Sequence, residues 1–539
     1  MRLAPLLAAF LTVSAAFAAP PPDFQKRVAA LAGEGPGGVV AAWVDDAGTV
    51  YAQAGTRSKQ DARPLDADTP IAIGSVTKVF TALLLAETQL QGKARLDDPA
   101  ARYLLPAGAT LTGPLASITL ETLSTHQSGL PRLPFNLGPN PDGDPQPYAR
   151  YDRAAMVVAL REDGARALAA RHVTYSNFGV GVLGEALAGA WGTSYEEALQ
   201  ARVLEPLRLR HTRLLLEARP DPEVAPAHPR GVERPNWTFQ AMAPAGALRS
   251  TARDLARFVR ACVGLDETPL RAAIDLTLKP RASAPEQGGQ IGLGWFLSGE
   301  EGKRVANHGG ATAGATAFVL IDPAGRRGVV LLANQNRNLE RLGFDLLDVT
   351  PPRPERAKVA DADTFAGRYP LNPAFNLDIT AREGALFVQA TGQSALPLQR
   401  LEPDRFKVVG VPAEIAFERN GGGEVVALVI RQNGRDQRGE RRPLPAPPKQ
   451  VALPDSALAE YVGKYPLNPS FVLTVTHEPG QLHVQATGQP KFPVFASAKD
   501  HFHYTVVEAK LVFERDAAGK VVAVVLHQNG AKVRGERRD

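Results

Sequence analysis

The residues in this sequence best suited to chemistry are a serine and a lysine three positions apart, Ser75 and Lys78, in the stretch Gly74-Ser75-Val76-Thr77-Lys78. Apolar residues recur at three- and four-residue steps from Val76 to Leu85, which predicts a buried helix that begins at this stretch. One helical turn separates the two side chains, so the lysine amine can reach the serine hydroxyl. Burial would lower the pKa of the lysine, and a serine beside such a base is an activated nucleophile.

Two further polar motifs follow this pair. A serine and a lysine at this spacing are expected by chance about twice in a chain of 539 residues, so the pair alone is a weak signal. Downstream come Tyr175-Ser176-Asn177 and His308-Gly309-Gly310, in the order and rough spacing of a second and a third active-site motif. An isolated Tyr-Ser-Asn is more often a turn, and a single histidine at a strand end is more often structural. The three motifs together predict one site.

This set of motifs resembles that of the serine β-lactamase and penicillin-binding protein superfamily, in its class C-like branch, which also holds D,D-carboxypeptidases, D-aminopeptidases and esterases. Residues 123–130 and 243–251 also resemble signature stretches of the branch, and the resemblance covers roughly residues 24–340. It implies that Ser75 attacks a carbonyl carbon, and that Lys78 and Tyr175 share its proton and return it to the leaving group.

The resemblance also implies how a substrate would be bound. Asn177 would hold the substrate's amide, and the backbone N–H groups of Ser75 and Ala311 would form an oxyanion hole. The small residues Gly309 and Gly310 would let a substrate lie close to their strand. The implied substrate-binding residues are Asn177, His308, Gly309, Gly310 and Ala311.

His308 departs from the superfamily's pattern, which has lysine at this position. Lysine offers a fixed positive charge to the carboxylate of a β-lactam or of a peptide C-terminus, whereas histidine is largely neutral at pH 7. This departure weakens the β-lactamase and carboxypeptidase hypotheses. It favours substrates without that carboxylate, namely esters, amides or peptides cut at the amino end.

Composition limits the class of protein. The apolar fraction of 44% and the charged fraction of 22% are those of a globular protein, and the net charge of +5 is mild, so we expect no nucleic-acid partner. Residues 1–19 carry one early positive charge, an apolar stretch and small residues before Pro20, which predicts a signal peptide and an exported protein without membrane attachment after its removal. Cys262, the one cysteine, lies in a helical apolar pattern and is expected to pack in a core.

The order of the predicted elements gives the architecture of residues 20–350. A hairpin at residues 39–51 is followed by a mainly helical region and then by strands near residues 294–297, 304–307, 317–321 and 329–333. Strands at both ends with helices between them predict a β-lactamase-like α/β domain, with one mostly antiparallel sheet flanked by helices and an all-helical lobe. Residues 133–148, rich in Pro, Asn and Gly, are expected to form a long loop beside the site.

After a proline-rich linker at residues 351–354 the chain repeats itself. The sequence from Phe365 to Pro373 returns from Tyr461 to Pro469, and later matches keep the same offset of 96 residues without a gap. Short alternating runs within each copy predict two small all-β antiparallel barrels, residues 357–442 and 453–539. They resemble the lipocalin-like domains of some branch members, which implies a possible homo-oligomer assembled through the barrels, in an order most similar to that of bacterial D-aminopeptidases.

The sequence therefore favours an exported serine hydrolase that acts through an acyl-enzyme on small amides, peptides or esters, without a cofactor. A β-lactamase, a D,D-carboxypeptidase, or a binding protein that keeps the pocket without turnover are the alternatives. A metallohydrolase is a further alternative, because His501 and His503 share one strand face, although no cluster of carboxylates or cysteines supports it.

Overall fold

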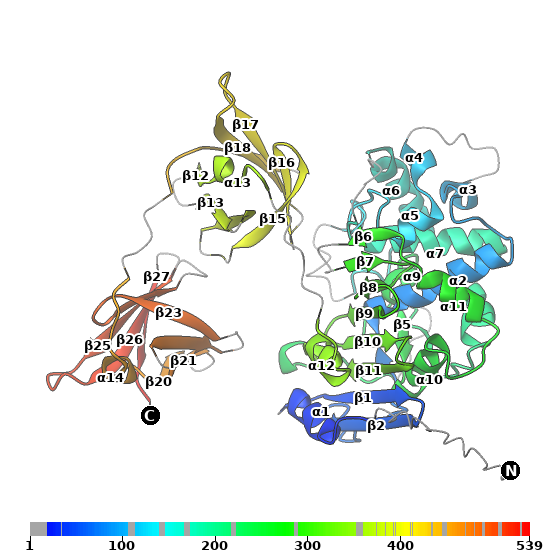
Figure 1. Cartoon of the computed structure of the whole chain (residues 1–539), viewed down its shortest axis with the longest axis horizontal. Helices are drawn as coiled ribbons and strands as arrows, with labels where there is room; N and C mark the ends of the chain where they lie inside the picture. Colours follow the sequence, from blue (N-terminus) through cyan, green and yellow to red (C-terminus); the bar gives the residue numbers. More distant parts are fainter. Residues whose placement is uncertain are drawn as a thin grey trace, which may run out of the picture. The chain divides into compact units, whose positions relative to one another are not determined.

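The computed structural model of the 539-residue chain describes most of it as two compact units, residues 1–355 and 356–539 (Figure 1). The described residues are 19–33, 35–105, 114–138, 146–166, 173–216, 223–284, 289–351, 359–372, 375–382, 384–391, 393, 395–409, 411, 413–432, 435–444, 450–468, 471–478, 480–487, 491–504, 509–528 and 531–538. The predicted signal peptide lies outside them, except for its last residue. Within these ranges no helix combines the length and the apolar character needed to cross a bilayer.

The first unit is built on one eight-stranded antiparallel sheet, as the sequence predicts. Its strand order is β2-β1-β11-β10-β9-β8-β7-β6, so strands from the two ends of the domain are neighbours. The strands are β1 (Gly38–Asp45), β2 (Gly48–Gly55), β6 (Ala282–Ala284), β7 (Gly289–Ile291), β8 (Phe296–Ser298), β9 (Val305–Ala311), β10 (Thr316–Asp322) and β11 (Arg327–Ala333). A small second sheet has the order β3-β5-β4, made of β3 (Ile71–Ala72), β4 (Arg213–Leu214) and β5 (Leu248–Ser250).

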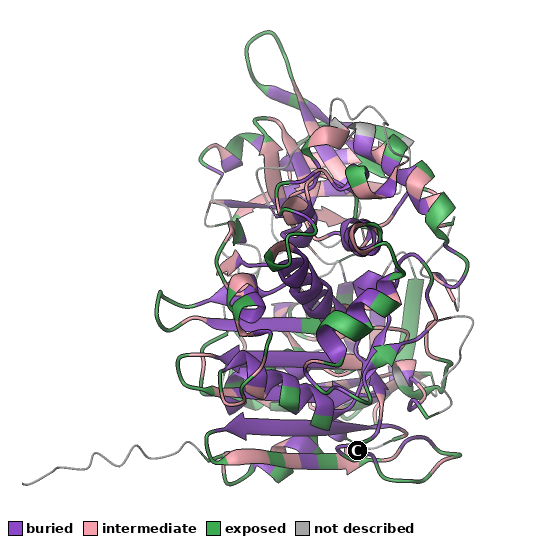
Figure 2. Cartoon of the chain, turned by 90° about the vertical axis from the view of Figure 1, so that its right-hand side faces the viewer, coloured by how far each residue is buried: buried purple, intermediate pink, exposed green. Residues whose placement is uncertain are grey.

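Helices cover both faces of the large sheet, and its central strands are buried along nearly their whole length (Figure 2). One face packs with α1 (Phe24–Ala32) and α12 (Leu339–Leu346) in one apolar core, and the other packs with α2 (Thr77–Leu90) and α10 (Ala252–Cys262) in a larger one. The remaining helices of this unit are α3 (Ala101–Leu104), α4 (Pro114–Ser117), α5 (Leu120–Ser124), α6 (Arg153–Arg166), α7 (Asn177–Trp191), α8 (Tyr195–Leu199), α9 (Ala243–Gly246) and α11 (Arg271–Thr277), with single turns η1 (Gly74–Val76), η2 (Gln200–Leu204) and η3 (Pro229–Gly231). The described residues between 101 and 204 form the predicted helical lobe.

Side-chain caps explain where several of these helices begin. Ser194 accepts a hydrogen bond from the backbone of Glu197, whose carboxylate accepts one in return, and this capping box starts α8. Thr251 caps α10 in the same position, where its side chain accepts a hydrogen bond from the backbone N–H of Asp254. Ser176 caps α7, and this cap fixes the beginning of the helix that carries the second predicted motif.

Each copy of the repeat is a nearly closed barrel of eight antiparallel strands. The first contains α13 (Ala362–Phe365), β12 (Gly367–Asn372), β13 (Phe375–Arg382), β14 (Ala385–Ala390), β15 (Leu396–Glu402), β16 (Arg405–Val408), β17 (Ala413–Arg419), β18 (Val425–Gln432) and β19 (Arg435–Glu440). The second contains α14 (Asp455–Ala459), β20 (Gly463–Asn468), β21 (Phe471–Glu478), β22 (Gln481–Ala486), β23 (Lys491–Ala498), β24 (His501–Tyr504), β25 (Ala509–Arg515), β26 (Val521–Gln528) and β27 (Ala531–Glu536). A backbone bridge joins the first and last strands, Arg368 with Arg442 and Lys464 with Arg538.

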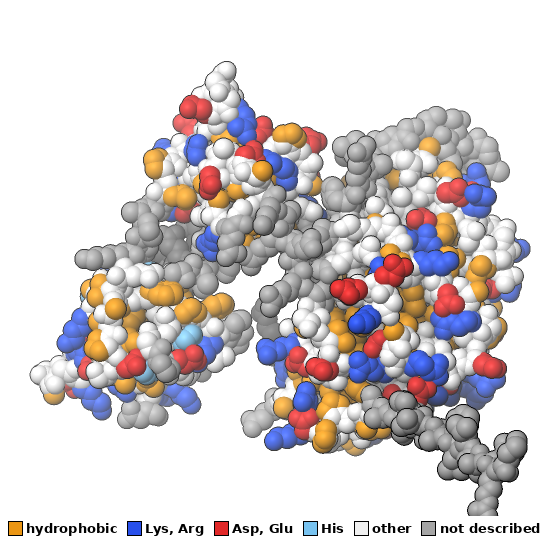
Figure 3. Space-filling model, in the orientation of Figure 1, with side chains coloured by type: hydrophobic (Ala, Val, Ile, Leu, Met, Phe, Trp, Pro, Cys, Tyr) orange, Lys and Arg blue, Asp and Glu red, His pale blue; other side chains and the backbone are white. Residues whose placement is uncertain are grey.

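Basic and acidic side chains are mixed on the face of each barrel that Figure 3 shows. Arg431 pairs with Asp436 at 2.9 Å, and Arg438 pairs with Glu418 at 2.9 Å. Arg431 and Arg438 are therefore each paired with a carboxylate on the same sheet.

Candidate active site

Ser75 and Lys78 lie at the junction of a short 3₁₀ turn and a buried helix. Ser75 is in η1, which runs directly into α2, so the first turn of the predicted helix is tighter than an α-helical one. The Nζ atom of Lys78 lies 3.1 Å from Oγ of Ser75 and donates to the backbone oxygen of Ala245 at 2.6 Å. The side chain of Lys78 is almost fully buried, with 1% exposed.

The environment of Lys78 favours its neutral form. Burial lowers the pKa of the Lys78 amine well below its ordinary value, and the positive charge of Arg132 lowers it further. Lys78 forms no salt bridge with any carboxylate of the described ranges, so nothing of opposite charge there offsets the cost of burial. A neutral amine at hydrogen-bond distance from a serine hydroxyl can accept its proton.

Tyr175 completes a group of three around the serine. It stands just before α7, its phenol lies close enough to Ser75 to interact with it, and its ring centroid lies 4.9 Å from Nζ of Lys78. Burial raises the pKa of Tyr175 to about 12, although the interaction with Ser75 and the charge of Arg132 oppose this rise. Tyr175 is therefore protonated at neutral pH and is placed to pass a proton.

Two histidines flank the Tyr175 ring, at centroid distances of 4.5 Å for His126 and 6.5 Å for His308. Both are buried, and burial lowers the pKa of His126 well below its ordinary value and that of His308 to about 3. The Nδ1 atom of His308 is 2.7 Å from the backbone oxygen of Gly309, and Nε2 has no hydrogen-bond partner among the residues that the structure describes. His308 is therefore uncharged at neutral pH, and it does not line the cavity described below. Its direct contact with a substrate stays a prediction.

The backbone of the third motif packs directly against the backbone of η1, the turn that carries Ser75 and is called the serine turn below. A Cβ atom added at Gly310 would lie 2.0 Å from the backbone oxygen of Ile73 and 2.9 Å from the backbone nitrogen of Ser75. Gly74, with a φ of +49°, would bring a Cβ atom within 2.7 Å of the backbone nitrogen of Ala311. Only glycine permits this contact at both positions, and the contact places the serine turn against the strand that carries Ala311.

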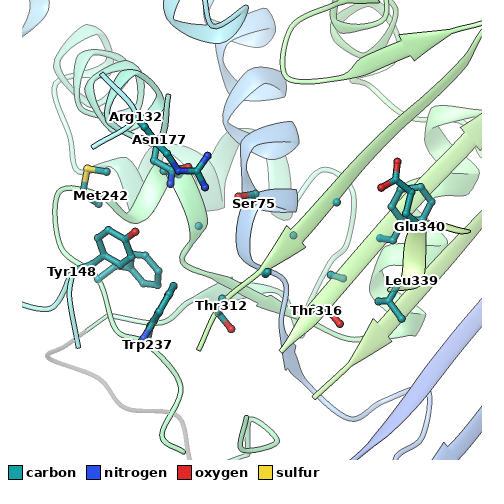
Figure 4. A pocket seen from close by; sticks show the side chains of 18 of the residues that line it. Ser75, Arg132, Tyr148, Asn177, Trp237, Met242, Thr312, Thr316, Leu339 and Glu340 are labelled. Atoms are coloured by element: carbon teal, nitrogen blue, oxygen red, sulfur yellow. The ribbon is translucent and has the colours of Figure 1, made fainter. Parts of the chain in front are cut away.

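A cavity of about 500 Å³ opens at Ser75 (Figure 4). Of the predicted substrate-binding residues, Asn177, Gly309, Gly310 and Ala311 line it. The Oδ1 atom of Asn177 is buried and has no partner within the described part of the chain. The remaining lining residues are Arg132, Leu133, Tyr148, Trp237, Phe239, Met242, Ala245, Gly246, Thr312, Thr316, Ala317, Phe318, Arg337, Asn338, Leu339 and Glu340.

Sequence reasoning missed the aromatic wall and the arginine of this cavity. Tyr148 stacks on Phe239 with ring centroids 4.9 Å apart and meets Trp237 edge-on at 5.5 Å. The signals available were the predicted loop beside the site, which ends at Tyr148, and Arg132, which lies two residues after the signature-like residues 123–130. The structure places these residues on the same side of Ser75 as Asn177 (Figure 4).

Neither the two histidines of the metallohydrolase hypothesis nor Cys262 forms a second candidate site among the described residues. The described ranges contain no cluster of three or more His, Cys, Asp and Glu side chains that could hold a metal ion. His503 is buried in β24, whereas His501 on the same strand is exposed. Cys262 is buried at the end of α10, and burial raises the pKa of its thiol.

This fold and its serine–lysine pair place the chain in the serine β-lactamase and penicillin-binding protein superfamily, in its class C-like branch. Members of this branch are serine hydrolases. The chain belongs to the Beta-lactamase family, whose model matches residues 24–350. Residues 447–537 match a second model, described as "Domain of unknown function (DUF3471)". The predicted superfamily and fold class are confirmed, whereas the lipocalin-like character of the barrels stays a prediction.

Three similar proteins illustrate the relationship. D-alanyl-D-alanine-carboxypeptidase/endopeptidase AmpH of Escherichia coli (strain K12) is 25% identical over 329 residues, covering 56% of this chain and 81% of AmpH. The crystal structure of D-alanine carboxypeptidase AmpC from Burkholderia cenocepacia has a TM-score of 0.50 and 26% identity, covering 60% of this chain and 95% of that chain. The crystal structure of SurE has a TM-score of 0.52 and 24% identity, covering 76% of this chain and 95% of that chain, and this likeness concerns the fold.

Proposed function

We propose that this protein is an exported serine hydrolase that forms an acyl-enzyme on Ser75 and acts on small amides, peptides or esters. The observation that carries the proposal is the 3.1 Å distance between Oγ of Ser75 and Nζ of a lysine that is buried without a carboxylate partner among the described residues. A serine hydroxyl needs a neighbour to take its proton, and a neutral lysine is one recognised arrangement.

In the proposed reaction, Oγ of Ser75 bonds to the substrate's carbonyl carbon while its proton passes to Nζ of Lys78. The carbonyl oxygen becomes an oxyanion, for which the backbone N–H groups of Ser75 and Ala311 are the proposed donors. The phenol of Tyr175 then gives a proton to the leaving group as the bond to that group breaks, and Lys78 passes the proton that it took from Ser75 to the resulting phenolate. A water molecule then attacks the acyl group and releases it from Ser75, with Tyr175 and Lys78 transferring protons in the reverse direction.

Asn177 is proposed to bind the substrate's amide, because its buried Oδ1 atom lacks a partner within the described ranges and its side chain lines the cavity. Amide and peptide substrates also agree with the names of AmpH and the Burkholderia cenocepacia enzyme, both D-alanine carboxypeptidases. Export rests on the signal-like composition of residues 1–19, and assembly through the barrels remains a proposal that the resemblance supplies.

A fluorophosphonate probe tests the nucleophile directly. We expect intact-mass analysis to show one covalent adduct on the wild-type protein and none on Ser75→Ala. Ser124→Ala is a matched control, because Oγ of Ser124 is buried and has no hydrogen-bond partner among the described residues. An adduct that persists in folded Ser75→Ala would refute the proposal, and an acyl group from an ester that is never released would favour the non-turnover alternative.

A further inference from the structure

Arg132 is held next to the second motif by backbone hydrogen bonds. Its backbone oxygen accepts hydrogen bonds from the backbone N–H groups of Asn177 at 3.0 Å and Phe178 at 3.1 Å, which ties it to the first turn of α7. Its guanidinium carbon lies 5.4 Å from the ring centroid of Tyr175, and the side chain lines the cavity beside Asn177 (Figure 4). Across the part of the chain that the structure describes, no carboxylate forms an ion pair with it.

The other charged groups of the cavity do not offer a cation. Arg337 also lines it, but its guanidinium donates to the backbone oxygens of Leu31 and Ala32 at 2.9 and 2.8 Å. Glu340 lies on the opposite side of Ser75 from Arg132 (Figure 4). His308 stands where the superfamily has its lysine, and it is uncharged at neutral pH. Arg132 is therefore the available positive charge among the described lining residues.

The position of Tyr175 indicates which part of a substrate Arg132 would meet. In the proposed function Tyr175 gives its proton to the leaving group, so the leaving group lies against the Tyr175 phenol. Arg132 stacks over the ring of the same tyrosine, and a planar guanidinium can form two hydrogen bonds to one carboxylate.

We propose that Arg132 is a specificity-determining residue that binds a carboxylate on the leaving group of the substrate. This inference rests on the proposed function and deepens it. It revises the expectation drawn from His308, because the positive charge is present but comes from the connection after α5 instead of from strand β9. The favoured substrates are then peptides or related acyl compounds cleaved next to a free carboxylate.

Two thioesters with the same phenylacetylglycyl acyl group test the inference. One releases thioglycolate, and the other releases the methyl ester of thioglycolate, so they differ by one carboxylate; a thiol-reactive dye measures both. We expect the wild-type protein to prefer the acid, and Arg132→Gln to reduce the ratio of the two kcat/KM values by about ten- to a hundredfold, the usual effect of losing a charged hydrogen bond. Arg132→Lys should restore part of the preference, and Arg337→Gln should keep it, since its guanidinium is already bonded to the backbone.

The ratio within one variant is independent of the fraction of active protein and of any change in Tyr175. A wild-type protein without preference for the acid, or an unchanged ratio in Arg132→Gln, would overturn the inference. Thiol release that survives Ser75→Ala would instead refute the proposed function. If neither thioester is cleaved, titration of tryptophan fluorescence with phenylacetylglycylglycine and with its C-terminal amide gives the same comparison for binding, because Trp237 lines the cavity. Equal affinities for the two would also overturn the inference.

Discussion

Replacing Lys78 by methionine separates the chemical role of the lysine from its packing. Methionine is unbranched and apolar and can fill the site, whereas the amine it replaces is buried and bonded only to Ser75 and to the backbone oxygen of Ala245. We expect kcat/KM to fall by about 10²- to 10⁴-fold, as for loss of a positioned proton acceptor. We also expect the variant to be the more stable protein at neutral pH, because burying the amine in the wild type is costly.

The pH dependence of this stability difference follows from one proton. The unfolded chain binds a proton at Lys78 up to pH about 10.4, whereas the folded protein loses it at the lower pKa that burial imposes. Between these two values the unfolded state binds one proton more, so the wild-type free energy of unfolding rises with pH by about 1.4 kcal/mol per unit relative to Lys78→Met. The stability advantage of the variant should therefore shrink steadily from neutral to alkaline pH.

Urea unfolding followed by tryptophan fluorescence can measure this difference without removing the barrels. All four tryptophans lie within residues 24–350, namely Trp43, Trp191, Trp237 and Trp295. The signal therefore reports the β-lactamase-like domain alone, and groups that titrate equally in the two proteins cancel in the comparison. A stability difference that does not change with pH would mean that Lys78 is charged in the folded protein. That result would refute its assignment as the proton acceptor.

Three further outcomes test the rest of the site. Gly310→Ala should lower kcat/KM by at least about a hundredfold, because its Cβ atom would lie 2.0 Å from the backbone oxygen of Ile73 and displace the turn that carries Ser75. In Gly309→Ala the nearest neighbour of the new Cβ atom is 3.8 Å away, so kcat/KM should stay within about twofold of the wild-type value. Steady-state kinetics on both variants compares them. Tyr175→Phe should lose about 10²- to 10⁴-fold in kcat/KM with little change in the thermal unfolding midpoint, and a wild-type rate in this variant would exclude the phenol from proton transfer. His308→Gln should leave the shape of the pH–rate profile between about pH 5 and 8 unchanged, because the pKa of His308 is about 3; loss of a limb from that profile would show that this histidine titrates there.

Much of the site could be predicted because its signals are local. The periodicity after Ser75 predicts a buried helix, and one helical turn fixes the distance to Lys78 within hydrogen-bond reach. The residue that caps α7, Ser176, lies inside the second motif, so neighbouring residues also determine where that helix begins. The tight 3₁₀ turn at Ser75 could not be predicted, because it depends on contact with a strand more than two hundred residues away.

The placement of His308, Arg132 and Tyr148 could not be predicted for the same physical reason. Side chains alternate along β9, so His308 and Gly310 point to the same face of the strand. Nothing local in the sequence tells that His308 lies beside the Tyr175 ring without lining the cavity, whereas Gly310 lines it. Arg132 and Tyr148 belong to connections without periodicity, and such segments are placed by tertiary contacts, here the backbone bonds to Asn177 and the stacking on Phe239. The expectation about substrate charge rests on His308 alone and stays a prediction.

The repeat shows what a duplicated sequence does and does not decide. Matching residues carry the strand irregularities of both copies, at Pro370–Asn372 and Pro466–Asn468, and the bridges that join first and last strands also stand at matching positions. Each bridge joins strands of its own copy, so the edges of each barrel are covered without strands from the other. Duplication therefore yields two complete modules, not halves of one. It follows that differences between the copies at outward-facing positions are not constrained by barrel closure, and any separate binding roles of the two modules must be sought there.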